Sequence, residues 1–181
     1  MSQTIQDKLD YSDYRHIPSD GNRYELLEGA LHVTPAPSPL HQRVSKRLQR
    51  ILEAYFEEKG LGEVFNAPLD VILTNQDVVQ PDLVLVTNPE QISSQGIEGP
   101  PLLLVEVLSP STRNYDQRAK AQRYAVLGVP HYWMVDPDEH WVECYRASNA
   151  AYTLIIKAGQ AENLLHPDWP ELHISLSDLW G

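Results

Sequence analysis

A single glutamate inside an apolar run is the feature of this sequence that most restricts how the chain can fold. The run extends from Pro101 to Pro110, and Glu106 is its only charged residue. Its length and composition predict a strand, in which Glu106 shares one face with Leu104 and Leu108 because side chains alternate. A buried carboxylate is costly unless it is paired with a cation or binds a metal ion. The sequence therefore predicts a polar site within the core of a sheet.

A second acid and a lysine surround this run in the sequence. Asp82 directly precedes the apolar residues 83–86, and Lys120 lies in a helical pattern over residues 115–127. Two acids on adjacent strands, with a cation on the following helix, suit the metal-assisted hydrolysis of a phosphate ester. Asp82, Glu106 and Lys120 are therefore candidate catalytic residues.

Length and composition are those of one globular domain. The chain has 181 residues, so we expect a single domain over residues 1–181, with its core at about 23–145 and a flexible segment over 1–20. Its net charge of −11 argues against a protein that coats nucleic acid non-specifically, since such binding neutralises phosphates with basic side chains.

Cysteine usage and hydropathy exclude several other classes. Cys144 is the only cysteine, which excludes an intramolecular disulfide and a cysteine zinc site. The histidines other than His41 lack the spacing of a metal site, and His41 itself is a candidate phosphate or water contact at the start of a helix. No apolar stretch suits a signal peptide or a membrane span, so we expect a cytoplasmic protein without membrane contact.

Hydrophobic periodicity and turn residues predict an alternation of helices and strands. We expect a hairpin of 23–27 and 30–34, a helix over 40–59, strands over 63–66, 69–74 and 82–86, a loop over 87–100, the Glu106 strand, a helix over 115–127, strands over 131–135, 141–145 and 151–157, and a C-terminal tail that packs back on the body.

The charges of the predicted helix 40–59 are distributed against the helix dipole, with the basic residues first and the acidic residues last. One interpretation is a phosphate-binding helix end. The other is a solvated face that pairs its own charges, for example Arg50 with Glu53.

With these elements in order, the chain resembles the PD-(D/E)XK nuclease superfamily. More narrowly, it is similar to the restriction-endonuclease-like family that was long classified as a domain of unknown function. The residues that carry the resemblance are Tyr24 to Gly29, His41, Gln80-Pro81-Asp82, Val105 to Thr112, Asp116, Lys120, Tyr124, Gly128-Val129 and Tyr132 to Pro137.

The resemblance implies an α/β fold with a restriction-endonuclease-like core of order αβββαβ, in which helices flank a mixed central sheet. It also implies a nuclease that acts on nucleic acid, most often DNA, and it suggests Glu25 as a third acid near the metal. Nucleases that cut both strands often pair their sites in a homodimer.

Magnesium, with manganese as a substitute, is the cofactor that the residues suggest. Mg²⁺ prefers hard oxygen ligands, which Asp82, Glu106 and the Val107 carbonyl can supply. Lys120 would then position the attacking water or stabilise charge on the phosphate.

One position departs from the superfamily pattern. The lysine expected two residues after Glu106 is Leu108, and Lys120 is its natural substitute. The alternative function is an inactive nuclease-fold protein that serves as a binding or assembly module. The structural alternatives are a Glu106 paired with Arg118 or Arg123, a Lys120 paired with Asp116 on an exposed helix face, and a Glu25 exposed on the hairpin.

Overall fold

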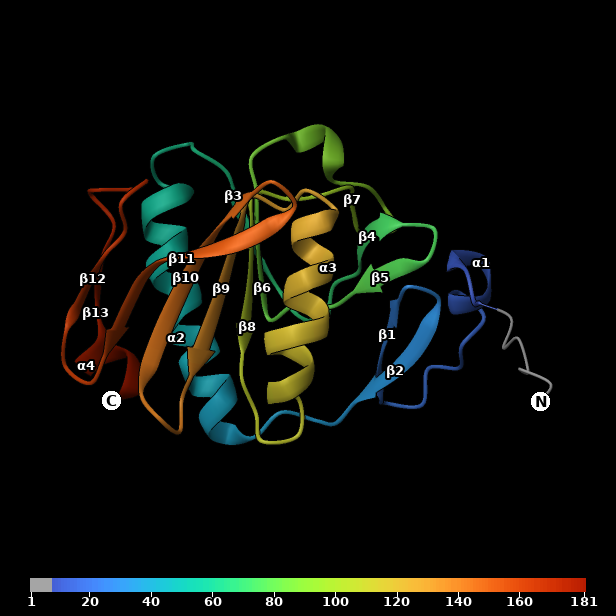
Figure 1. Cartoon of the computed structure of the whole chain (residues 1–181), viewed down its shortest axis with the longest axis horizontal. Helices are drawn as coiled ribbons and strands as arrows, with labels where there is room; N and C mark the ends of the chain where they lie inside the picture. Colours follow the sequence, from blue (N-terminus) through green and yellow to red (C-terminus); the bar gives the residue numbers. More distant parts are fainter. Residues whose placement is uncertain (1–7) are drawn as a thin grey trace.

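A six-stranded mixed sheet forms the centre of the computed structural model, which describes residues 8–181 (Figure 1). Its strand order is β11-β10-β9-β8-β6-β3, and only β8 and β9 run parallel to each other. The strands are β3 (Glu63–Asn66), β6 (Leu83–Val86), β8 (Leu103–Val107), β9 (His131–Asp136), β10 (Trp141–Ser148) and β11 (Ala151–Gly159).

Helices cover both faces of this sheet because β8 is apolar on both sides. Leu103, Val105 and Val107 pack in the same cluster as the buried residues of α2 (Pro39–Phe56). Leu104 packs in a second cluster, with Tyr124 of α3 (Ala121–Val126), on the opposite face. Within this sheet the chain order is α2, β3, β6, β8, α3, β9, which confirms the predicted αβββαβ core.

A second, smaller sheet lies beside the first and contains the predicted hairpin. Its order is β2-β1-β5-β4-β7, from strands β1 (Arg23–Leu27), β2 (Ala30–Thr34), β4 (Val71–Thr74), β5 (Asp77–Val79) and β7 (Ile97–Glu98). The hairpin turns at Glu28 and Gly29, with φ angles of 53° and 80°. Two successive positive φ angles match the right-handed twist of the paired strands.

The remaining elements are short and lie outside the two sheets. They are α1 (Tyr11–Tyr14), the 3₁₀ turn η1 (Pro89–Gln91), the paired strands β12 (Asn163–Leu165) and β13 (His173–Ser175), and α4 (Leu176–Trp180). Leu176 and Leu179 are buried in the cluster that contains α2, so the tail packs back on the body as predicted. Among residues 8–181, no helix combines the length and the hydropathy of a membrane span.

Several predicted boundaries are wrong. β5 was not predicted, and the predicted strand 141–145 extends to Ser148. The first long helix ends at Phe56 and not at Lys59, because Gly60 turns the chain with a φ of 66° and the Leu61 N–H bonds back to the Phe56 carbonyl. The predicted loop 87–100 contains β7, which pairs with β4. A Cβ on Gly96 would clash with the Asp70 carbonyl oxygen, so only glycine permits this pairing.

The predicted flexible segment 1–20 lies outside the described residues up to residue 7. Two backbone hydrogen bonds attach its following part to the small sheet. The Leu9 N–H donates to the Gly29 carbonyl at 3.0 Å, and the Tyr11 N–H donates to the Asn75 carbonyl at 2.7 Å.

A buried ion pair attaches the small sheet to α3. Asp77 on β5 accepts hydrogen bonds from Nε and a terminal nitrogen of Arg123, at 2.8 and 2.7 Å. Burial alone would raise the pKa of Asp77, but hydrogen bonds from Arg123, from Thr74 and from the Glu28 N–H hold it below its ordinary value. A carboxyl whose pKa is lower in the folded state stabilises the fold above the unfolded pKa.

Asp77→Asn should therefore lower the free energy of unfolding at pH 7 by about 3 kcal/mol, because the Arg123 guanidinium loses its counter-charge. The difference from wild type should shrink as the pH falls below about 4, because the Asp77 carboxyl of the unfolded chain is then protonated, and it should vanish once the pH falls below the lower pKa of the folded state. Urea unfolding at pH 7 and pH 3 measures both values, with Glu58→Gln at an exposed position as the control. Equal destabilisation at the two pH values would contradict the charge argument.

Candidate active site

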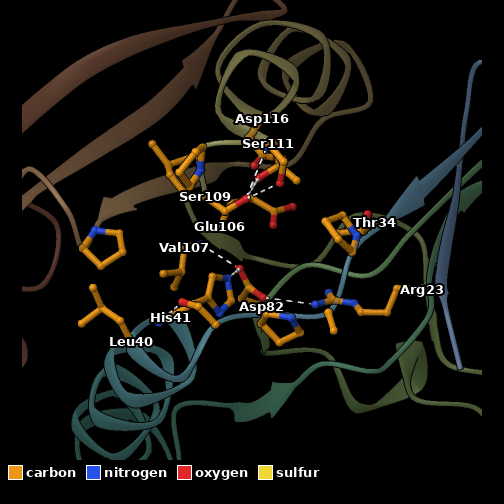
Figure 2. A pocket seen from close by; sticks show the side chains of 18 of the residues that line it. Arg23, Thr34, Leu40, His41, Asp82, Glu106, Val107, Ser109, Ser111 and Asp116 are labelled. Carbon is orange, nitrogen blue, oxygen red and sulfur yellow. Dashed lines mark hydrogen bonds and ion pairs between the residues drawn. The ribbon is translucent and has the colours of Figure 1, made fainter.

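A pocket of about 380 Å³ opens where β6 begins and β8 ends, and it brings the predicted site residues together (Figure 2). Its walls come from both sheets, from the start of α2 and from the turn after β8. Among the lining residues are the four candidate catalytic residues and the candidate carbonyl ligand, which are Asp82, Glu106, Lys120, Glu25 and Val107.

The two acids of the large sheet face each other across neighbouring strands. In the antiparallel pair β6–β8, Leu83 lies opposite Val105, so Asp82 and Glu106 occupy the next opposed positions. The two residues are 6% and 4% exposed, respectively. The sheet register therefore places two nearly buried carboxylates at one end of the pocket.

Asp82 is held in its ionised form by three donors. Its Oδ2 accepts the Val107 N–H at 2.8 Å and lies 3.1 Å from His41 Nε2, while Oδ1 is 3.5 Å from an Arg23 nitrogen. Figure 2 shows His41 and Arg23 on either side of this carboxylate. Burial would raise the pKa of Asp82, but the His41 hydrogen bond and the charges of His41 and Arg23 lower it below its ordinary value.

Lys120 is the centre of a buried charge cluster. Its Nζ lies 2.8 Å from Glu25 Oε2, 3.0 Å from Glu106 Oε1 and 3.3 Å from Asp116 Oδ1. Burial would lower the pKa of Lys120, but the three carboxylates raise it well above its ordinary value, with Glu106 contributing most. The lysine is therefore a permanent cation in a pocket with more acids than bases.

The pKa values of Glu106 and Asp116 are raised, whereas the pKa of Asp82 is lowered. Burial raises the pKa of Glu106 well above its ordinary value, and Lys120 offsets only part of this effect. Burial also raises the pKa of Asp116, again against the attraction of Lys120. Tyr124 donates a further hydrogen bond of 3.2 Å to Glu106 Oε1.

The helix that carries Lys120 starts with widened turns. Residues Tyr115–Lys120 (η2) are π-helical, a geometry that frequently occurs at functional sites. The Tyr132 hydroxyl donates to the Asp116 carbonyl at 3.1 Å, which anchors the first of these turns on β9. This anchored segment directs both Asp116 and Lys120 into the pocket, where they are 2% and 3% exposed.

All three structural alternatives are wrong in this fold. Lys120 does pair with Asp116, but it is buried and also binds Glu25 and Glu106. Arg123 pairs with Asp77 instead of Glu106, and Arg118 is exposed. Glu25 is 1% exposed and accepts the Gln80 N–H at 2.8 Å, so it is not a surface charge of the hairpin.

The position of the missing lysine is apolar. Leu108 is 1% exposed and packs in the cluster that contains Tyr124 of α3, although it also contributes to the pocket wall. Lys120 reaches the space beside Glu106 from the helix. Val107 turns its side chain into the other cluster and donates its N–H to Asp82.

Sequence reasoning assigned no role in the site to Arg23, Asp116 or Tyr124, although Asp116 and Tyr124 are among the residues that carry the resemblance. The side-chain periodicity of strands and helices indicates the position of all three residues. Arg23 and Glu25 are two residues apart on one strand and so share a face. Asp116 and Tyr124 lie one helical turn on either side of Lys120 and so lie near its face.

The donor set fits a hard divalent cation. Asp116 Oδ1 is buried and, apart from its ion pair with Lys120, has no hydrogen-bond partner among the described residues. Glu106 uses Oε1 for its bonds to Lys120 and Tyr124, and no hydrogen bond from a described residue reaches its other oxygen. Carboxylate oxygens with free lone pairs at a polar pocket are the ligands that Mg²⁺ prefers.

Comparison with known proteins gives the same family by sequence and the same fold by structure. A putative nuclease of the DUF820 family from Anabaena variabilis superposes with a TM-score of 0.77 at 18% identity, covering 95% of this chain and 97% of that one. The "Uncharacterized protein slr1290" of Synechocystis sp. is 31% identical over 104 residues, which are 57% of this chain. The chain spans about half the length of this relative, 54%.

The family model "Uma2: Putative restriction endonuclease" matches residues 11–177, which includes both sheets and every residue of the pocket. The chain therefore belongs to the Uma2 family of restriction-endonuclease-like proteins.

Proposed function

We propose that this protein is a Mg²⁺-dependent endonuclease that hydrolyses phosphodiester bonds of DNA. The observation that carries the proposal is the position of Lys120, whose ammonium lies 3.0 Å from Glu106 in the pocket that Asp82 also lines. An acid pair on adjacent strands with a cation beside it is the arrangement that phosphate-ester hydrolysis requires.

Each residue of the pocket has a role in this proposal. Asp82 and Glu106 would hold the metal, together with the Val107 carbonyl. Asp116, whose Oδ1 accepts no hydrogen bond from a described residue, is an additional candidate ligand. His41 and Arg23 fix the orientation of the Asp82 carboxylate, as groups behind a metal ligand commonly do.

When bound, Mg²⁺ polarises the phosphate and lowers the pKa of the attacking water. Lys120 remains protonated, because its neighbours raise its pKa, so it acts as a fixed positive charge beside the phosphate or as a donor that orients the water. Glu25 holds the Lys120 ammonium from the smaller sheet at 2.8 Å and therefore acts as a positioning residue.

A groove beside the pocket supports nucleic acid as the substrate. It measures about 610 Å³ and shares Arg23, His41 and Asp82 with the pocket. Arg43 and Lys46 of α2 line it, both are exposed, and neither forms an ion pair with a described residue. This basic strip on a chain of net charge −11 offers phosphates a path that leads to the acids.

The strip also favours a phosphate-binding role for the basic residues of α2 over a solvated face that pairs its own charges. No salt bridge among residues 8–181 joins Arg50 to Glu53, and Glu53 instead accepts a hydrogen bond of 2.7 Å from Gln49. Arg43, Lys46 and Arg50 therefore have no ion pair with a described residue, whereas Arg47 donates to the Leu179 carbonyl at 3.1 Å. An inactive module is the rival function, and cleavage and metal-binding assays on variants of the pocket separate the two.

Glu106→Gln should reduce metal-dependent cleavage of plasmid DNA by at least about 100-fold, because the amide is a weaker ligand and carries no charge. Calorimetric titration of Mg²⁺ should show binding to wild type that is absent from the variant. Glu58→Gln, which removes an exposed charge, is the control. Undiminished cleavage by Glu106→Gln would refute the assignment, and a wild type that neither binds metal nor cleaves would favour the inactive module.

Lys120→Met should separate catalysis from metal binding. Without Mg²⁺ the variant should unfold with a free energy lower by about 3 kcal/mol, since three buried acids are deprived of their counter-charge. Mg²⁺ should raise its Tm more than that of wild type, because the metal no longer competes with the ammonium for Glu106. Cleavage should still fall by about 100-fold or more. Full activity in the metal-loaded variant would show that Lys120 is only structural.

Replacing both Arg43 and Lys46 with glutamine should weaken DNA binding, measured by fluorescence anisotropy of a labelled duplex without divalent metal. The slope of log Kd against log salt should fall by about 0.9 for each phosphate that the variant no longer neutralises. Arg50→Gln is the control, because it removes one positive charge from the same helix outside the groove. A weakening by the control that equals half of the effect of the double variant would indicate a general charge effect instead of a defined path. RNA of the same sequence tests the preference for DNA.

A further inference from the structure

A second group of potential metal ligands lies away from the active-site pocket. His131, at the start of β9, meets His166 and Asp168, which follow β12. One potential ligand atom from each residue lies within 4.8 Å of the other two. The two histidines are far apart in the sequence, so no local spacing indicated this group.

The histidine nitrogens of this group are poorly satisfied by the protein. His131 and His166 are 8% and 1% exposed, and His131 Nδ1 and His166 Nε2 have no hydrogen-bond partner among residues 8–181. His166 Nδ1 accepts the Asp168 N–H at 3.2 Å, and this hydrogen bond would be exchanged for the metal when the ring binds a cation through either nitrogen. His131 Nε2 lies 3.8 Å from Asp168 Oδ2, which is too far for a hydrogen bond. Buried polar atoms without partners are rare in proteins, and a bound ion is one way in which such atoms are satisfied.

The 3.8 Å between His131 Nε2 and Asp168 Oδ2 is close to the distance between two ligand atoms of one metal ion. With bonds of about 2.0–2.2 Å and tetrahedral angles, a nitrogen and an oxygen on the same Zn²⁺ are about 3.4 Å apart. Small side-chain movements would therefore bring His131 and Asp168 into a common coordination sphere. His166 would supply the third protein ligand.

The surroundings keep both imidazoles neutral, which is the form that binds metals. Burial, together with the neighbouring His131, lowers the pKa of His166 to about 4. Burial likewise lowers the pKa of His131, against the attraction of Asp168. Neutral imidazole nitrogen together with one carboxylate is a ligand set that suits Zn²⁺ better than Mg²⁺.

Neighbouring side chains fix the positions of the three ligands. Trp169 stacks on His166 at 4.2 Å between ring centroids and contacts the His131 ring at 4.7 Å. Arg146 donates through Nε to Asp168 Oδ2 at 2.9 Å and through a terminal nitrogen to Oδ1. Hydrogen bonds from a second layer orient metal ligands, although the charge of Arg146 also reduces the attraction for a cation.

We propose that His131, His166 and Asp168 form a structural Zn²⁺ site that attaches the C-terminal segment to the start of β9. The site is distinct from the active-site pocket, since none of its three residues lines that pocket. His131 begins the strand whose last residue, Asp136, directly precedes the pocket residues Pro137 and Asp138. The two sites therefore lie at opposite ends of β9, and a zinc ion would act on the stability of the fold and not on cleavage.

Calorimetric titration of Zn²⁺ into the full-length protein tests this site. Wild type and Glu106→Gln should both bind zinc at the histidine site, and zinc should raise the Tm of both. His166→Phe keeps an aromatic ring against Trp169 and should abolish this binding. Asp168→Asn, at an exposed position, should weaken it at least about tenfold and serves as a second variant in case His166→Phe does not fold. His173→Gln, an exposed histidine of the same segment, is the control and should bind as wild type does.

Co²⁺ gives an independent measurement, because its visible spectrum reports tetrahedral coordination by nitrogen and oxygen. The band should appear in Glu106→Gln and be absent from Asp168→Asn at the same metal concentration. Absence of zinc binding to wild type would overturn the proposal. Zinc binding that is abolished in Glu106→Gln but unchanged in Asp168→Asn would overturn it as well, because it would assign the metal to the active-site pocket.

Discussion

The site in this protein depends on one buried cation surrounded by acids. The Lys120 ammonium lies within 3.3 Å of oxygens from Glu25, Glu106 and Asp116, none of which has enough water around it to be stable as an isolated charge. Their mutual attraction offsets the cost of burial only while all of them stay in place. The loss of any one of these charges would therefore change the geometry of the pocket and also destabilise the elements that form it.

The members of this cluster come from separate parts of the chain, so the cluster also organises the fold. Glu25 belongs to the small sheet, Glu106 to the large sheet, and Lys120 to the crossover between two parallel strands. The ion pair of Asp77 with Arg123 joins the small sheet to the same crossover. Together with the contact of Glu28 to Arg123 at 3.5 Å, three charged contacts thus attach the small sheet to the helix segment that supplies the lysine.

Local sequence signals predicted most helices and strands, but they did not predict the contacts between segments that are distant in the sequence. The hairpin turn and the αβββαβ order follow from turn residues and periodicity, and Glu106 was conspicuous because it interrupts an apolar run. β5 and β7 were missed because strands of three and two residues are too short to show periodicity. The π-helical turns depend on Tyr132 from another strand, and the group around His166 exists only once the tail has docked.

Because Glu25 comes from the second sheet, the charge cluster depends on the assembly of both sheets. A chain that has formed only the large sheet already holds Asp82 and Glu106 opposite each other, but its lysine lacks the carboxylate that fixes it from the other side. The complete charge cluster therefore forms only when both sheets are in contact. A molecule truncated within the small sheet would keep the two acids opposite each other but would lose the carboxylate that holds Lys120 from the other side.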